Sequence, residues 1–253
     1  MLSMVFLAMA AAEFWLLIWV LKRFAATRAP ALAMAAVPLA LQWADAGIIG
    51  AGRWIGEGDT LLWLNQLRFF WHAFTLPALI IGLGSILRAA QAPLLTKPWV
   101  MGAFCLAAVV AWFVQWPWWP QADFVTACYG DTLRYVNHVA GAQICRSDQS
   151  LGVAGGFPVV GLVVILLELI AGLWLWRRRG WIWLTLGSLL VLITATTAQM
   201  RHGMLPSFIG DGLSMLAYAV TASAYAADRS LFAQGQPAAD HAVRNPDTDR
   251  KHT

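Results

Sequence analysis

The chain has 253 residues, of which 60% are hydrophobic and 12% charged, and its formal net charge is +4. So little charge excludes an ordinary soluble domain. Because the charged residues are concentrated between long apolar runs, the sequence predicts a multi-span membrane protein, and the positive charge is no sign of nucleic-acid binding. Seven runs are long enough to cross about 30 Å of hydrocarbon at about 1.5 Å per residue: 4–21, 30–50, 61–87, 98–117, 153–176, 181–200 and 206–226.

The first span lacks a basic segment before its apolar run, so we expect it to be retained rather than cleaved as a signal peptide. Lysine and arginine favour the loops after odd-numbered spans, which predicts an outside N-terminus and a cytoplasmic C-terminus. The predicted fold is an all-α bundle of seven transmembrane helices, integral to a bacterial inner (plasma) membrane. The basic residues of the odd loops are Lys22, Arg23, Arg28, Arg88, Lys97, Arg177, Arg178 and Arg179.

Span three carries a polar stripe formed by Asn65, Arg68, His72 and Thr75. Steps of three or four residues put these side chains on one helix face. A charge in lipid costs at least a few kcal/mol, so the stripe should face a protein interior or a wet cavity. With the N-terminus outside, Arg68 lies about 10 Å below the outer surface. We expect Thr75 to bond back to the helix backbone before Pro77, which removes one backbone donor.

The long loop after span four, residues 118–152, is predicted to be an outer lid. Cys128 and Cys145 both lie in it, and a disulfide between them suits an oxidising compartment, with two free thiols as the alternative. Cys105 falls within span four, where we expect a small buried apolar residue.

Span seven carries a second stripe, formed by Ser207, Asp211, Ser214, Tyr218 and Thr221. The polar residues in the outer halves of spans seven and two lie at a depth similar to that of the span-three stripe. This common depth predicts a polar pocket in the outer half of the bundle.

Buried Arg68 needs a carboxylate, and either Asp211, Asp45 or both can supply it. Two interpretations remain open, a working site and a set of bonds that lock helices together. For a working site we expect catalytic roles for His72, Asp211 and Arg68. Substrate contacts are expected from Asp45, Asn65, Trp71, Thr75, Ser214 and Tyr218.

Two further acids lie within predicted spans. Glu13 lies mid-span, within reach of the pocket, whereas Glu168 is expected to pair near the Arg177–Arg179 cluster. No metal site is predicted because neither HxxxH nor HExxH occurs. No phosphate-loop, glycine-rich dinucleotide or GxSxG signature occurs, so these motifs identify no cofactor.

The membrane domain is expected over 1–226, followed by a polar, disordered cytoplasmic tail over 227–253.

The run from Arg68 to Pro77 resembles the third helix of microbial rhodopsins, which carries an arginine, an aromatic residue and later Thr-x-Pro. The resemblance implies seven helices, with Arg68, Thr75 and Asp211 at the family's arginine, threonine and seventh-helix aspartate. The chain departs from the family where the retinal-binding lysine should lie, because Met215 is there, and where the counter-ion acid should lie, because Trp71 is there. No lysine lies in any predicted span, which argues against covalent retinal.

Three functions are compatible with these patterns. The first is a membrane enzyme that acts on a lipid or isoprenoid-like substrate by acid/base chemistry. The second is a non-retinal, rhodopsin-like protein for ligand binding, transport or sensing. The third is a structural or assembly subunit whose polar stripes are helix locks. The lipid bilayer is the one partner that all three share.

Overall fold

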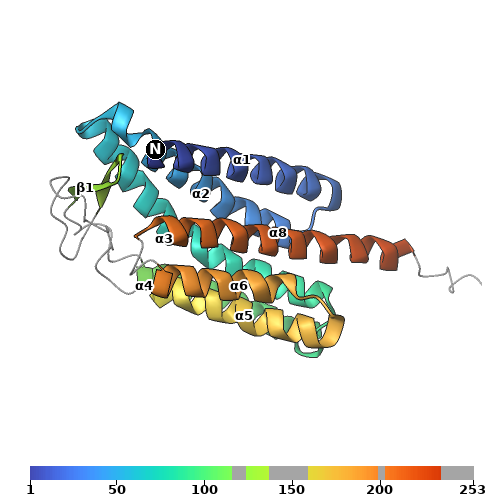
Figure 1. Cartoon of the computed structure of the whole chain (residues 1–253). Helices are drawn as coiled ribbons and strands as arrows, with labels where there is room; N and C mark the ends of the chain where they lie inside the picture. The colour runs from blue at the N-terminus through green and yellow to red at the C-terminus, as the bar shows by residue number, and fades with distance from the viewer. Residues whose placement is uncertain (116–123, 137–158, 199–202, 235–253) are drawn as a thin grey trace, which may run out of the picture.

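The computed structural model describes residues 1–115, 124–136, 159–198 and 203–234. This part of the chain is mostly helical, with helices lying lengthwise beside one another (Figure 1). The helices are α1 Leu2–Thr27, α2 Pro30–Ile55, α3 Asp59–Ala89, α4 Pro98–Gln115, α5 Val159–Arg179, α6 Trp183–Ile193 and α8 Leu205–Gln234. A 3₁₀ helix, Pro93–Thr96, precedes α4, and a π-helical turn, Thr194–Ala198, follows α6.

The helical class predicted from composition is confirmed, and each expected span corresponds to one helix. Four helices, α1, α2, α3 and α5, are long and apolar enough to cross a membrane, while α4 and α6 are shorter apolar helices. The last helix differs most from expectation, because α8 continues to Gln234, well into the region expected as a disordered tail. Polar composition alone did not end this helix, since its residues after Ala226 include good helix formers. Residues 235–253 lie outside the described part.

The breaks between the first helices have local causes. Arg28 adopts a left-handed φ of 52° and its amide bonds to Phe24, which ends α1. Pro30 then opens α2, at a position where a missing amide hydrogen costs nothing. The next break falls at Gly56, whose φ of 80° suits glycine.

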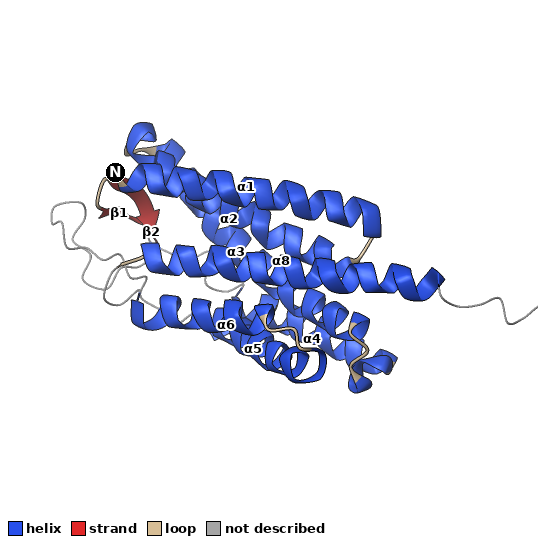
Figure 2. Cartoon of the chain, turned by 45° about the vertical axis from the view of Figure 1, so that its right-hand side comes forward, coloured by secondary structure: helices blue, strands red, loops and turns tan. Residues whose placement is uncertain are grey.

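Helix α8 is central and packs against α1, α2, α3 and α6 (Figure 2). The main apolar core lies mostly in the half of the bundle where α2 begins and α3 ends. It contains Leu32, Leu39, Leu83, Ile86, Leu175, Leu184 and Ala222, among others. That half is therefore densely apolar, and the buried charges described below lie in the other half.

A β-hairpin sits at the end of the bundle where α2 ends and α3 begins (Figure 2). Strands β1 Val125–Tyr129 and β2 Thr132–Val136 pair antiparallel through a two-residue turn, Gly130 and Asp131. Gly130 has φ of 57°, the positive value that such turns favour. The sequence prediction for this loop was only a lid. A signal for the hairpin is present, because two short runs rich in Val, Thr and Tyr flank a Gly-Asp pair.

The hairpin rests directly on the α2 backbone at Gly52. A Cβ atom at this position would lie 1.8 Å from the carbonyl oxygen of Leu133. We therefore expect Gly52→Ala to lower the free energy of unfolding in detergent by about 1–3 kcal/mol, because hairpin and helix must move apart. Gly102→Ala on α4 is the matched control, since a Cβ atom added there would have no other group within 4 Å. Equal unfolding free energies for the two variants would contradict this packing.

Asp131 in the hairpin turn is tied to the first two helices. It accepts hydrogen bonds from the Met1 amino group, the Ser3 amide and, at 2.7 Å, Arg53 Nη1. These donors, the amino group first, hold the pKa of Asp131 well below its usual range. A lowered pKa gives stability above the ordinary carboxyl pKa that is lost as pH falls through the folded value.

Hydrogen exchange of 125–136 tests this contribution, with each protein compared with Asp131→Asn at the same pH. We expect the native hairpin to be better protected than the variant at pH 7. The difference should shrink steadily as the pH falls below about 4. A difference that is unchanged at low pH would show that the Asp131 charge does not hold the hairpin.

Candidate functional site

A buried aspartate joins α2 to two polar residues of α3. Arg68 Nε lies 3.0 Å from Asp45 Oδ1, and His72 Nε2 lies 2.9 Å from Asp45 Oδ2. The side chains of Asp45 and Arg68 are each 7% exposed, whereas that of His72 is 40% exposed. Of the two acids considered for Arg68, the structure therefore selects Asp45. The Arg68 contact is a close ion pair that lacks hydrogen-bond alignment.

These three residues lie at matching depth because α2 and α3 run antiparallel. Asp45 is about 15 Å from the end of α2, while Arg68 and His72 are about 14 and 20 Å from the start of α3. A step of four residues places Arg68 and His72 on the same face. The spacing in the sequence thus explains why one carboxylate contacts both.

The Asp45 contact fixes the chemistry of the His72 ring. An ionised carboxylate only accepts hydrogen bonds, so Nε2 must carry the proton that it shares with Asp45. In the neutral ring, Nδ1 then holds the free lone pair. An aspartate that orients a histidine in this way prepares it to take up and release a proton.

Arg134 of β2 reaches the same region from the hairpin. It is 2% exposed, on the inward-facing side of its strand with Thr132 and Val136. Burial, and then the nearby charge of Arg68, lower the pKa of Arg134 to about 10. Arg134 is not among the site residues expected from the sequence. No local signal predicts its inward position, because strand alternation would place the apolar Leu133 and Tyr135 inward and Arg134 outward.

Three more acids extend the cluster across the bundle. Asp211 of α8 interacts electrostatically with His72 and Asp45, and Glu13 of α1 interacts with Asp45 and Asp211. Glu13 therefore belongs to the polar cluster. The predicted pairing of Glu168 near Arg177–Arg179 is wrong, because Glu168 is buried and interacts with Asp211 instead. The helical run of α5 carries that arginine cluster away to an exposed end.

The polar residues of α8 that follow Asp211 contact other parts of the bundle. Ser214 is buried where α8 passes close to Gly187 of α6, and the Tyr218 hydroxyl donates to the Leu79 carbonyl at 3.0 Å. Thr221 accepts a hydrogen bond from Trp181 Nε1. These side chains join helices. Ser214 and Tyr218, expected as substrate contacts, thus pack α8 against α6 and α3.

The remaining residues of the α3 stripe are buried beside the cluster. Asn65 donates to the Leu61 carbonyl at 2.7 Å, and its side-chain oxygen has no hydrogen-bond partner in the described residues. The prediction that Thr75 bonds back to its helix is wrong, because its hydroxyl is likewise unbonded within that part. Cys105, expected to be buried, is exposed because it lies on the outer side of α4. Cys145 lies outside the described residues, so its pairing with Cys128 stays a prediction.

An aromatic strip runs beside His72 along α3 and onto α4. Trp71, which is exposed, contacts the rings of Phe70 and Phe74, and Phe74 in turn contacts Trp112. Trp112 contacts Phe113, which is also exposed. We name Phe70, Trp71, Phe74, Trp112 and Phe113 the aromatic strip. It forms an apolar surface on the outside of the bundle, next to a histidine that is partly accessible.

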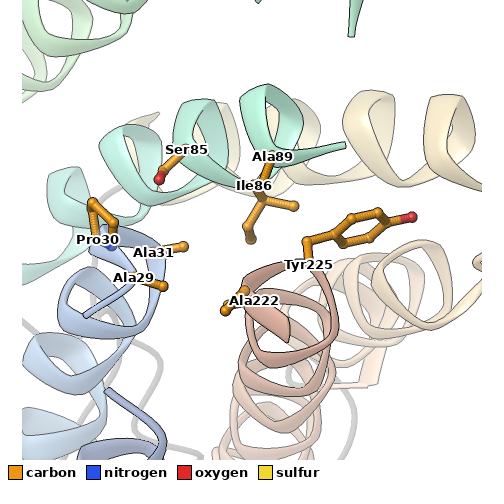
Figure 3. A pocket seen from close by; sticks show the side chains of 9 residues that line it. Ala29, Pro30, Ala31, Ser85, Ile86, Ala89, Ala222 and Tyr225 are labelled. Atoms are coloured by element: carbon orange, nitrogen blue, oxygen red, sulfur yellow. The ribbon is translucent and has the colours of Figure 1, made fainter. Parts of the chain in front are cut away.

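Two pockets lie at the opposite end of the bundle from the hairpin. One is lined by α2, α3 and α8, including Pro30, Ser85 and Tyr225 (Figure 3). The other, of about 310 Å³, is lined by residues that include Arg179 and Trp181. Neither pocket contains Asp45, Arg68 or His72. Within the described ranges, no group of three or more His, Cys, Asp or Glu residues is arranged to hold a metal ion.

The arrangement therefore combines an oriented, partly accessible histidine with the buried guanidinium groups of Arg68 and Arg134. Comparisons with known proteins add no family to this description. No family model matches the chain, and no curated protein matches it.

Proposed function

We propose that this protein is a membrane enzyme that carries out acid/base chemistry on a lipid or isoprenoid-like substrate. One observation carries the proposal: His72 is held at 2.9 Å by a buried aspartate while its own ring stays 40% exposed. A histidine that only locks helices would gain most by being buried with its partner. An oriented but accessible imidazole is the arrangement that proton transfer to a bound substrate requires.

The surroundings of His72 support an apolar substrate. The aromatic strip lies on the outside of the bundle, where a membrane would place acyl chains against it. A substrate with a hydrocarbon chain can then approach His72 from within the bilayer. Asp211 is a second acid whose charge and that of His72 act on each other, and in this proposal it exchanges a proton with the ring or the substrate.

The proposal includes a membrane topology. All seven helices cross the inner membrane of a bacterium, the N-terminus and the hairpin lie outside, and the basic residues after odd-numbered helices lie in the cytoplasm. Cys128 and Cys145 then face an oxidising compartment and form a disulfide. Phosphatase fusions after each helix test the topology, and mass spectrometry of unreduced peptides tests the disulfide.

The enzyme proposal is tested with purified protein in liposomes made from a total bacterial lipid extract. We expect untargeted lipid mass spectrometry to show a product that grows with time for the native protein and is absent for His72→Gln. Arg177→Gln is the control, because that side chain is exposed at the far end of α5. No time-dependent product from any bacterial lipid extract, with or without an isoprenoid fraction added, would count against an enzyme.

Proton transfer across the bundle is a second candidate function. It is favoured by the buried acids Glu13 of α1 and Glu168 of α5, because the charge of Asp211 on α8 acts on both of them. The dense apolar core of the other half opposes it. A pH-sensitive dye inside liposomes distinguishes the two: proton flux lost in Glu168→Gln supports transport, and no flux supports the enzyme.

A further inference from the structure

We propose that Arg68 and Arg134 together bind the phosphate of a phosphorylated lipid, beneath the hairpin. This inference rests on the proposed function and names its substrate class. A diphosphate has the same chemistry and is included. Neither arginine alone defines the site, since one comes from α3 and the other from β2.

The two guanidinium groups come from elements that pack against each other, α3 and β2. Both side chains are more than nine-tenths buried, and the charge of Arg68 acts on Arg134. Two like charges in a low-dielectric interior repel strongly, so a fold that brings them together gains when an anion lies between them. Asp45 is near both, but it already contacts Arg68 and His72.

The N–H donors of Arg68 also favour a phosphate ligand. Its contact with Asp45 uses Nε, and Nη1 is buried without a hydrogen-bond partner in the described ranges. An unbonded buried donor is costly, and a ligand oxygen would satisfy it. A guanidinium group presents several N–H donors in a fixed plane that matches phosphate oxygens. Two such groups from different directions suit a tetrahedral oxyanion better than a flat carboxylate.

The positions of the hairpin and the aromatic strip also suit a lipid, with its headgroup at one and its hydrocarbon chain at the other. The hairpin that carries Arg134 covers the end of the bundle, where the headgroups of a membrane would lie, and the aromatic strip lies along α3 and α4. A phosphate at the two arginines and a chain along the strip place the intervening atoms near His72.

The test measures binding of dodecyl phosphate to the full-length protein in an uncharged detergent, by isothermal titration calorimetry. Dodecanol and inorganic phosphate are the two comparison ligands. We expect dodecyl phosphate to bind at least about tenfold more tightly than either. Arg134→Gln should weaken it by about 10- to 100-fold, because a charge-assisted pair of bonds is lost. Arg134→Lys should fall between, and Arg177→Gln should bind like the native protein.

Each other outcome decides the matter differently. Equal affinity for inorganic phosphate would assign the site to a free anion and overturn the lipid. Equal affinity for dodecanol, or no loss in Arg134→Gln, would overturn the anion site. If Arg134→Gln does not purify folded, the same comparison is made with Arg134→Lys, where native affinity would overturn the proposal. His72→Gln separates the two proposals, because it should bind dodecyl phosphate normally while forming no product.

Discussion

Replacing His72 with glutamine should lower the turnover rate by about 10²- to 10⁴-fold while the bundle stays folded. Glutamine keeps a hydrogen-bond donor for Asp45 but has no group that takes up and releases a proton near neutral pH. Initial rates of product formation in liposomes measure the loss. The folded state is checked by thermal unfolding in the same detergent.

Two variants make the His72 result specific. Asp45→Asn should also lower turnover, because an amide does not hold the ring in the same protonation state. Ser188→Ala is the control, since Ser188 is a buried polar residue that bonds to the Leu184 carbonyl of its own helix, away from the cluster. Full activity in His72→Gln would exclude proton transfer by this side chain.

Replacing Asp45 with alanine should have the largest effect on stability, lowering the free energy of unfolding by about 3–5 kcal/mol. The substitution leaves Arg68 buried without its carboxylate, and breaking a buried pair costs more than the pair contributes. Unfolding in mixed detergent micelles with increasing denaturant measures the difference. Native and variant proteins must be compared at the same protein and detergent concentrations.

A second substitution tests the cause of that loss. Adding Arg68→Met to Asp45→Ala should recover much of the free energy, because the unpaired charge is then removed. A single variant Asp45→Ala that is destabilised by less than about 1 kcal/mol would show that Arg68 finds water or another acid.

The helices could be predicted from the sequence because each is a long apolar run, and membrane helices need no alternation to be recognised. The common face of Arg68 and His72 followed equally from helical spacing. Their partner did not, because Asp45 and Asp211 fall at similar depths and only the packing of α2 against α3 selects one.

The contribution of the hairpin to the candidate site could be predicted only in part. The Val, Thr and Tyr residues on either side of Gly130 and Asp131 indicate two strands, but nothing local indicates that Arg134 enters the bundle. Its position depends on the docking of β2 against α2, a contact between residues far apart in the sequence. Glu168 is similar, since its neighbour Asp211 comes from another helix.

The central claim is that the buried charges form a working site rather than a helix lock. Asp45→Leu, Arg68→Met and His72→Phe, combined in one protein, replace them with apolar residues of similar size. Apolar replacement of a complete buried ion pair is often neutral or stabilising, so this protein should fold with native or higher thermal stability. Lipid mass spectrometry should then find no product from it. Product formation at the native rate would contradict the claim and leave the cluster a structural one.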